Sequence, residues 1–401
     1  MFSKSSHDLS RKCDFKSKGE PNMPKPAVVV YCDHLLLFSQ TFVLAQGEGL
    51  QQFTPYYVGS RLVKDLTLPA ERTLVVNRGG TLGKVREVPH KFWGIAPTFY
   101  RRVQQLDPVL IHAHFGVGGA LALPLKRRLK VPMLVTFHGF DATVKDEYAR
   151  HSYYGLRVYL KRKQALKHQA QLFITVSEFI KGKLLEQGFP SDKLLVHYIG
   201  VDTETFQADP DVPREPLVLF VGRLVEKKGC EYLIRAMSKV QAVMPEANLV
   251  VIGDGPLRPI LEQLAAKTLR RYRFLGVQPA ESVQTWMNRA SVFSVPSITA
   301  ASGDAEGFGI VFAEAQAMGL PVVSFASGGI PEAVAHSKTG FLVAERDSDG
   351  LAAYILQLLK DKELWQCFSQ KSQERVLTKF NLHSQTRALE DIYKAVLERK
   401  L

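Results

Sequence analysis

The sequence of 401 residues lacks several features that would assign it to other protein classes. No apolar run reaches the roughly 18 residues that span a bilayer, so no transmembrane helix is expected. The first residues are polar and contain no apolar h-region, and we therefore expect no secretory signal. The four cysteines lie far apart without the paired spacing of a metal site, which favours reduced thiols in a cytosolic protein.

The glycine-rich fingerprints of two nucleotide-dependent enzyme classes are also absent or incomplete. No GxxxxGK[ST] loop is present, which argues against a P-loop NTPase. A GxG pair begins at Gly116 and another at Gly253, but Leu121 and Arg258 stand where a dinucleotide-binding loop has its third glycine. An NAD(P)-dependent oxidoreductase is therefore only a remote alternative.

The sequence does contain short apolar runs that alternate with helical patterns, as in a parallel α/β sheet. We expect strands at 27–31, 56–58, 72–76, 109–114, 133–137, 173–176, 194–198, 217–221, 248–252, 272–275, 291–295 and 321–325. Residues 203–216 are polar with three prolines and predict an interdomain linker, and residues 351–401 predict amphipathic helices. Because the chain is longer than one core should support, these patterns indicate two α/β domains.

The stretch from Ser302 to Met318 holds two carboxylates, Glu306 and Glu314, on either side of a glycine turn. An apolar run precedes it, so the predicted order is strand, polar loop, glycine turn and helix. A helix that begins in glycines offers unpaired N–H groups and a positive dipole end, which suit a phosphate. A carboxylate beside such a site is suited to sugar hydroxyls.

Two other interpretations of this glutamate pair stay open on the residues alone. A glycosidase would use two carboxylates roughly 5 Å apart for retention or roughly 6.5–9.5 Å apart for inversion. Eight helical steps would separate them by about 12 Å, but the glycine turn leaves the distance undetermined. Alternatively, both glutamates could be solvent-facing or capping residues of a buried helix, since Glu is common at helix starts.

Further motifs set these residues in a wider pattern. The loop Gly222–Gly229 (GRLVEKKG) follows an apolar strand, and together with Glu306–Glu314 (EGFGIVFAE) it resembles glycosyltransferase family 4. The Ser-x-Thr-Phe pattern at residues 39–42 resembles the bacterial exopolysaccharide and lipopolysaccharide members of this family. Supporting matches occur, in the family's order, at Gly253–Pro256, Phe274–Gly276, Gly319–Val323, Gly328–Glu332 and Gly340–Val343. These motifs cover most of residues 217–345.

This resemblance implies the GT-B fold, with two Rossmann-like parallel α/β domains facing a cleft. We expect a disordered tail at residues 1–25 and an acceptor-binding domain at 26–205. A linker and a nucleotide-sugar-binding domain would follow at 206–385, and a C-terminal helix at 386–401 would cross back to the first domain. The resemblance implies donor-binding roles for Arg223, Lys228, Gly253, Val277, Gly307, Phe308, Gly309, Ile310 and Glu314, with Glu306 catalytic and contacting the donor sugar.

In the first domain, the predicted strand ends carry histidines at His114 and His138. From chemistry alone, a histidine there is often a hydrogen-bonded structural residue, whereas the resemblance makes His138 a catalytic residue that contacts the reacting sugar. His114, Asp141 and Ser39 are expected to bind the acceptor. The loop with Ser39 lacks the Gly-Gly pair of typical family members.

The predicted function is retaining transfer of a hexose from a nucleotide diphosphate sugar to a carbohydrate hydroxyl, in exopolysaccharide, lipopolysaccharide or glycolipid assembly. No cofactor and no required metal are expected, because the resemblance places no DxD-type metal pair. A non-catalytic family member that binds sugar nucleotide or a partner protein is the main alternative.

The formal charge of +13 is unevenly distributed. Residues 1–215 carry 30 Lys and Arg against 20 Asp and Glu, while the remaining residues carry 22 against 19. The excess is dense at Lys126–Lys130 and across Arg157–Lys167. No nucleic-acid-binding module accompanies this charge, so a nucleic-acid partner is not expected. A solvated basic face is one interpretation. The sharper one is a cytoplasmic protein bound peripherally to the anionic inner face of the plasma membrane, where it would meet a saccharide or lipid-linked saccharide acceptor.

Overall fold

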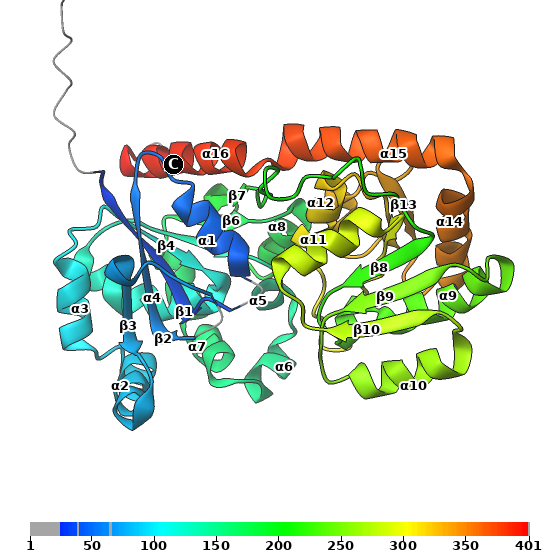
Figure 1. The fold of residues 1–401 in the computed structure, drawn as a ribbon. Coiled ribbons are helices and arrows are strands. Elements are labelled where there is room, and N and C mark those ends of the chain that lie inside the picture. Colours follow the sequence, from blue (N-terminus) through cyan, green and yellow to red (C-terminus); the bar gives the residue numbers. More distant parts are fainter. Residues whose placement is uncertain (1–24, 38–39, 64–65, 400–401) are drawn as a thin grey trace, which may run out of the picture.

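The computed structural model describes residues 25–37, 40–63 and 66–399. Nearly all of the predicted tail, and Ser39, lie outside these ranges, so both predictions remain untested. Figure 1 shows two α/β units side by side, with helix α16 (Leu382–Leu397) running above the first and α15 (Lys362–Arg375) above the second. The predicted fold class, a GT-B arrangement of two parallel α/β domains, is confirmed.

The elements follow the expected alternation of strands and helices. The strands are β1 (Ala27–Leu35), β2 (Thr54–Leu62), β3 (Thr73–Asn77), β4 (Leu110–His114), β5 (Met133–Phe137), β6 (Leu172–Thr175), β7 (Leu194–Val196), β8 (Leu217–Val221), β9 (Asn248–Ile252), β10 (Tyr272–Gly276), β11 (Val292–Phe293), β12 (Val322–Phe325) and β13 (Gly340–Val343). The remaining α-helices are α1 (Thr41–Glu48), α2 (Gly80–Trp93), α3 (Pro97–Gln104), α4 (Phe115–Leu129), α5 (Phe140–Thr143), α6 (Asp146–His151), α7 (Tyr154–Gln169), α8 (Glu178–Glu186), α9 (Cys230–Val243), α10 (Arg258–Thr268), α11 (Ala280–Arg289), α12 (Ile310–Ala317), α13 (Ile330–Ala333) and α14 (Ser348–Lys360).

Both sheets are parallel throughout and share one topology. The first has the strand order β3-β2-β1-β4-β5-β6-β7, and the second has the order β10-β9-β8-β11-β12-β13. The order reverses between β1 and β4 in the first sheet and between β8 and β11 in the second. In open parallel sheets, ligands bind beyond the carboxyl ends of the strands at such a switch point. The topology therefore places the loops after β4, β8 and β11 at the expected binding edges.

All twelve predicted strands are present, those at 133–137, 217–221 and 248–252 with the predicted boundaries and the others with shifted ones, and one strand was missed. Gly340–Val343 was noted only as a motif, but it forms β13 and pairs with β12 in register. It is only four residues long and begins with a glycine, so it gave little strand signal by itself. The strand predicted at 291–295 is reduced to the two residues of β11, which pair with β8 and β12.

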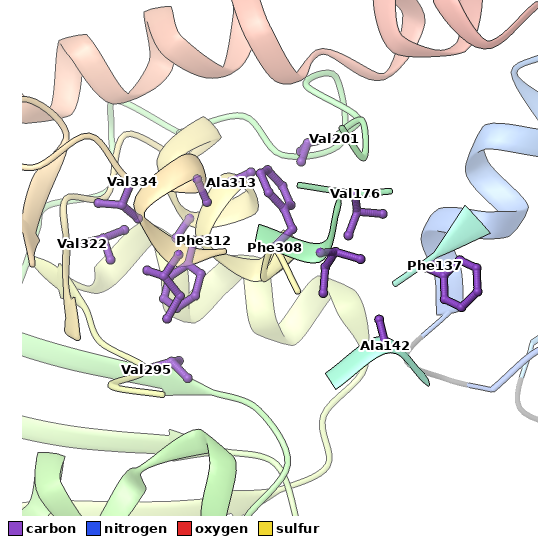
Figure 2. Close-up of a cluster of buried hydrophobic side chains, with 14 of the residues drawn as sticks. Phe137, Ala142, Val176, Val201, Val295, Phe308, Phe312, Ala313, Val322 and Val334 are labelled. Carbon is purple, nitrogen blue, oxygen red and sulfur yellow. The ribbon is translucent and has the colours of Figure 1, made fainter. Parts of the chain in front are cut away.

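The core is continuous between the two domains. One hydrophobic cluster contains Phe137 and Val176 of the first domain together with Phe308 and Phe312 of the second. Figure 2 shows Phe308 between the first-domain side chains on one side and the α12 side chains on the other. The Phe308 ring also lies 5.1 Å from the ring of Phe380, near the start of the crossing segment. The two domains are therefore joined by packing as well as by chain connectivity.

Helix α16 crosses back to the first domain, as the sequence predicted, but it begins at Leu382 instead of 386. Asn381 caps it, since its side chain accepts a hydrogen bond from Ser384 N at 3.1 Å. Its buried face contributes Tyr393, among others, to a cluster with residues of β4, β5 and β6. The Tyr393 hydroxyl lies 2.6 Å from Nδ1 of the buried His112. This bond ties the C-terminal helix to the centre of the first sheet.

Candidate active site between the two domains

Two loops at the carboxyl edge of the second sheet approach each other very closely. Gly229 ends the loop after β8 with φ +63°, and a Cβ there would lie 1.9 Å from the carbonyl oxygen of Pro296 in the loop after β11. Gly253, after β9, has φ +131°, and a Cβ there would lie 2.0 Å from the Gly222 carbonyl oxygen. Any side chain at either position would force the loops apart. These glycines therefore set the distance between the loops that carry the predicted donor-binding residues.

Glu306 is held at this junction by partners from both loops. Lys228 Nζ donates to Glu306 Oε2 at 2.5 Å, and Ser297 Oγ lies 3.3 Å from the same oxygen. Burial opposes ionisation, but the ammonium groups of Lys228 and Lys227 outweigh it and lower the pKa of Glu306 to about 2. The side chain is therefore a fixed carboxylate at neutral pH, and its other oxygen has no hydrogen-bond partner among the described residues.

Helix α12 begins directly after this carboxylate. Gly309 has φ +76°, and a Cβ there would lie 2.6 Å from the ring of Phe312, so the turn requires glycine. Within the described chain, the N–H groups of Phe308, Gly309 and Ile310 donate to no carbonyl or side chain. Such unpaired donors at a helix start favour an anion. These free donors leave room for the predicted phosphate contact, which stays a prediction, while the Phe308 side chain itself is buried in the core.

Glu314 lies one turn along the same helix and differs from Glu306 in its surroundings. It is half-buried, and its carboxylate has no hydrogen-bond or salt-bridge partner among the described side chains. Burial alone raises its pKa to about 7. An unpaired carboxylate at the edge of the site has both oxygens available for a ligand with two hydroxyl groups.

Two further predicted donor-binding residues follow strands of the second sheet. Arg223 follows β8, and its exposed guanidinium has no acceptor or carboxylate partner within the described ranges. Val277 follows β10 and is 64% exposed, which is unusual for a valine and leaves it available to pack against a ligand. Their contacts with a donor stay predictions.

The first domain contributes a pair of histidines. His138, after β5, places Nε2 3.0 Å from Nδ1 of His114, at the end of β4, and the two rings are stacked. Burial, with a smaller contribution from His112, lowers the pKa of His138 to about 3, so the ring is neutral. Its buried Nδ1 has no partner among the described residues. Such an orphan buried atom is rare in native cores and is consistent with a ligand contact.

Asp141 has a positioning role in this structure. Its carboxylate accepts hydrogen bonds from Gly116 N at 2.6 Å and from Gly139 N at 3.2 Å. These bonds stabilise the turn at Phe115, which has φ +65°, a strained value for a bulky residue. Burial raises the pKa of Asp141 to about 6, although these backbone donors oppose the shift. Its predicted contact with an acceptor hydroxyl is untested, and the backbone contacts explain its burial without one.

The histidine loop and the donor loop touch across the domain boundary. A Cβ on Gly307 would lie 2.1 Å from the carbonyl oxygen of His138, so only glycine allows this approach. Ser177 Oγ donates to the Gly307 carbonyl oxygen at 2.6 Å. Glu332 accepts from the N–H groups of Glu178 and Phe179, which caps α8 from the other domain. His138 and Glu306 are therefore brought together although 168 positions separate them.

Sequence reasoning missed several residues that build this site. Lys227 forms an ion pair with Asp304 at 3.0 Å. Ser297 contacts the Glu306 carboxylate, and Ser177 donates to the Gly307 carbonyl oxygen. Their only sequence signal was their place just beyond strand ends. Within the described ranges, no group of three or more His, Cys, Asp or Glu side chains could hold a metal ion, and none of the described helices is long and apolar enough to cross a bilayer.

Comparison with family models agrees with this arrangement. Residues 60–205 match the model described as Glycosyltransferase Family 4, and residues 202–375 match Glycosyl transferases group 1. The chain is 31% identical over 293 residues to a putative colanic acid biosynthesis glycosyltransferase of Salmonella typhimurium, covering 71% of this chain and 70% of that protein. It is 33% identical over 286 residues to an amylovoran biosynthesis glycosyltransferase of Erwinia amylovora, covering 70% and 68%.

A mycobacterial relative and two solved structures extend the comparison. A GDP-mannose-dependent phosphatidylinositol monomannoside mannosyltransferase of Mycolicibacterium smegmatis is 33% identical over 263 residues, covering 62% of this chain and 66% of that protein. The fold is similar to that of Anabaena HepE in complex with UDP and glucose, with a TM-score of 0.73, 19% identity and coverage of 92% and 100%. Sucrose-phosphate synthase from Thermosynechococcus elongatus also has a TM-score of 0.73, with 21% identity and coverage of 94% and 100%. The family matches and the identities to curated relatives together show that this chain belongs to glycosyltransferase family 4 and is a glycosyltransferase.

Proposed function

We propose that this glycosyltransferase moves a hexose from a nucleotide diphosphate sugar to a carbohydrate hydroxyl with retention of anomeric configuration. The observation that carries the proposal is the Glu306 carboxylate, fixed by Lys228 beside the free N–H groups that begin α12 and next to the His138 loop. A carboxylate suits the hydroxyls of a sugar, and the free N–H groups suit the phosphate attached to it.

The residues around the site can stabilise the leaving group. As the glycosidic bond breaks, negative charge develops on the diphosphate and the sugar becomes oxocarbenium-like. Arg223, Lys228 and the start of α12 would meet this negative charge, and Arg223 is free to do so because no described residue forms a hydrogen bond or an ion pair with its side chain. Glu314 would bind the two ribose hydroxyls of the nucleotide.

The neutral His138 would hydrogen-bond the donor sugar through its unpartnered Nδ1. We favour attack by the acceptor hydroxyl on the face from which the diphosphate departs. The new glycosidic bond forms as the sugar–phosphate bond breaks, and the departing phosphate takes the acceptor proton. No side chain then has to act as the general base, and no metal ion is required.

The relatives support a role in surface polysaccharide or glycolipid assembly. Two are named for colanic acid and amylovoran biosynthesis, and a third is named as a GDP-mannose-dependent enzyme acting on a phosphatidylinositol mannoside. HepE was solved with UDP-glucose and with UDP. GDP-mannose and UDP-glucose are therefore reasonable first donors to test, with a saccharide or lipid-linked saccharide as acceptor.

Hydrolysis of a panel of sugar nucleotides, with and without chelator, tests the donor, the metal requirement and the non-catalytic alternative together. We expect one sugar nucleotide to be consumed by the wild type, at the same rate in chelator, and much more slowly by Glu306→Gln. Binding of a sugar nucleotide without any turnover, with and without candidate acceptors, would instead favour the non-catalytic member of the fold.

We further propose that the first domain docks on an anionic cytoplasmic membrane surface, using α2. This helix exposes five large apolar side chains, and one more exposed apolar residue follows its end: Leu82, Val85, Val88, Phe92 and Trp93 in the helix, and Ile95 after it. Its opposite face buries Glu87 and His90. An amphipathic helix of this kind suits the headgroup boundary of a bilayer.

The basic stretch Arg157–Lys167 is divided between two faces of α7. Arg162 donates to the carbonyl oxygens of Lys91, Phe92 and Ala120, so it fixes α2 and is not available to lipid headgroups.

If α2 is the docking surface, sedimentation with anionic vesicles should weaken in the double variant Val85→Ser, Trp93→Ser. It should not weaken in the matched second-domain control Val243→Ser, Ile260→Ser, which removes two equally exposed apolar side chains. Equal sedimentation of both variants would exclude α2 as the docking surface.

A further inference from the structure

A cavity of about 1040 Å³ borders the proposed active site through Ala142 and Ala305 but is lined by none of the residues assigned to the reaction. One face of α7, represented by Arg157, Leu160 and Lys163, forms part of its wall, and α8 and the second-domain residues Thr299 and Gly303 form other parts. Neither Glu306 nor His138 lines it, nor does any residue assigned to the donor. Both domains contribute to the cavity.

The lining of this cavity is strongly cationic. Six cationic side chains face two carboxylates, Asp146 and Glu186: Lys145, Arg150, Arg157, Lys163, Lys167 and Lys183. Each carboxylate is already engaged, Asp146 by Lys163 at 3.6 Å and Glu186 by Lys183 at 2.8 Å. The local excess of positive charge is therefore carried by the other four cations.

Two of these four, Arg150 and Arg157, are exposed and have no acceptor or carboxylate partner within the described chain. A free guanidinium presents paired N–H donors in a plane, the geometry that matches phosphate oxygens. Lys145 donates to the carbonyl oxygen of Ala301 in the second domain, which places its charge at the domain boundary.

Lys167 is the least expected member of the group. Lys167 is 7% exposed, yet among the described residues its ammonium has a single hydrogen-bond acceptor, the Gln187 carbonyl oxygen at 2.6 Å, and lies 5.0 Å from the centre of the Phe189 ring. An ammonium group can donate three hydrogen bonds, and a buried charge without an anionic partner is unfavourable. An anion in the cavity would supply the missing partner.

We propose that this cavity is a second anion site that binds a multivalent phosphate group, of diphosphate size or larger. The volume exceeds what a single small ion fills. Arg150 comes from α6, and Arg157 and Lys167 come from α7, where nearly three helical turns separate them. The proposal does not depend on the proposed transfer reaction, because none of these residues is assigned to it.

A ligand here would contact the segments that join the domains. Lys145 N donates to the Ser302 carbonyl oxygen at 2.9 Å, and Ala305 N donates to Thr143 Oγ1 at 3.2 Å. Binding across this seam would stabilise the closed arrangement that brings the His138 and Glu306 loops together. The site would then influence donor turnover without touching the donor.

Inorganic pyrophosphate is the probe, titrated by calorimetry into Arg223→Ala protein so that the donor site contributes little. In this background we expect binding, and we expect it to weaken at least tenfold on adding Arg150→Ser and Arg157→Ser. The matched control adds Arg101→Ser and Arg102→Ser, two exposed arginines of α3 that carry the same charge. It should bind like the background. Equal weakening in both variants, or binding unaffected by either, would overturn the proposal.

Hydrogen exchange localises the same event and distinguishes it from a general charge effect. Pyrophosphate should protect the amides of Lys145 and Ala305 in the Arg223→Ala background but not in the cavity variant. Protection confined to the start of α12 would place pyrophosphate in the donor site and contradict the proposal. Melting temperatures without ligand confirm that the exposed arginine substitutions leave the fold intact.

A second arm asks whether the phosphate belongs to a soluble molecule or to a lipid headgroup. Vesicles of phosphatidylcholine containing phosphatidic acid are added to the Arg223→Ala protein. Release of vesicle-bound protein by pyrophosphate, lost in the cavity variant, would identify a headgroup. Unchanged vesicle binding alongside pyrophosphate binding in solution would identify a soluble ligand.

Discussion

Replacing Lys228 by Ala should affect both stability and catalysis, because its ammonium is the cation in contact with the buried Glu306 carboxylate. The pKa of Glu306 falls from 4.5 to about 2 despite burial, and a shift of this size corresponds to on the order of 3 kcal/mol of differential stabilisation. Lys227 supplies part of it. We therefore expect Lys228→Ala to destabilise the second domain by about 2 kcal/mol.

That loss should lower Tm by roughly 4–8 °C at neutral pH, at about 2–4 °C per kcal/mol for a domain of this size. Because the folded-state pKa of Glu306 is depressed, its stabilisation is complete above pH 4.5 and is lost as the pH falls toward 2. The Tm difference between variant and wild type should therefore shrink in acid.

Two further variants separate the pair from the cation alone. Adding Glu306→Gln to Lys228→Ala removes the unpaired buried charge and should restore most of the lost Tm without restoring turnover. Arg223→Ala should leave Tm unchanged, since the side chain is exposed and unpaired, while lowering kcat/KM about tenfold. A Tm for Lys228→Ala equal to that of the wild type, or no recovery with Glu306→Gln, would refute the reasoning.

Three other outcomes are expected. Nucleotide affinity should rise about tenfold between pH 6 and pH 8, because Glu314, with a pKa of about 7, accepts hydrogen bonds from both ribose hydroxyls only when it is ionised. A flat calorimetric pH profile in the wild type, matching that of Glu314→Gln, would exclude this role. Glu314→Ala should mainly weaken binding of free nucleotide and Glu306→Ala should mainly lower kcat, and identical binding defects would contradict that division. Tyr393→Phe should destabilise the first domain by about 1 kcal/mol through loss of the His112 hydrogen bond, which is measured as a drop in Tm, while kcat/KM stays unchanged. An unchanged Tm would show that the bond contributes little.

The strands and the position of the site were predictable because they depend on local pattern. Apolar runs ending in glycine or polar loops marked the strands, and the family motifs assigned Glu306 and Arg223 to loops that follow predicted strands of the second domain. The twelve predicted strands and the α/β class needed only this information. Glu306, Lys228 and His138 followed from family motifs.

The long-range geometry was not predictable from the same patterns. Nothing in the sequence indicates that Lys228 and Glu306 form a 2.5 Å pair, or that Gly307 meets the His138 carbonyl oxygen, since both contacts depend on how loops of separate strands are packed. Asp141 shows the converse difficulty. Its motif suggested a ligand contact, whereas in the structure its carboxylate stabilises the strained turn at Phe115. The basic stretch on α7 was likewise expected to form one basic face. In the structure Arg162 contacts α2, whereas Arg157 and Lys163 line the cavity on another side of the helix.

The central claim is glycosyl transfer with retention at the Glu306–His138 junction. The most direct measurement is NMR of the product formed from the sugar nucleotide that the hydrolysis panel identifies, with a saccharide acceptor. We predict a new glycosidic bond with the anomeric configuration of the donor, formed at a rate that falls at least tenfold in His138→Ala and in Glu306→Gln. A product of inverted configuration, or full transfer activity in both variants, would contradict the account.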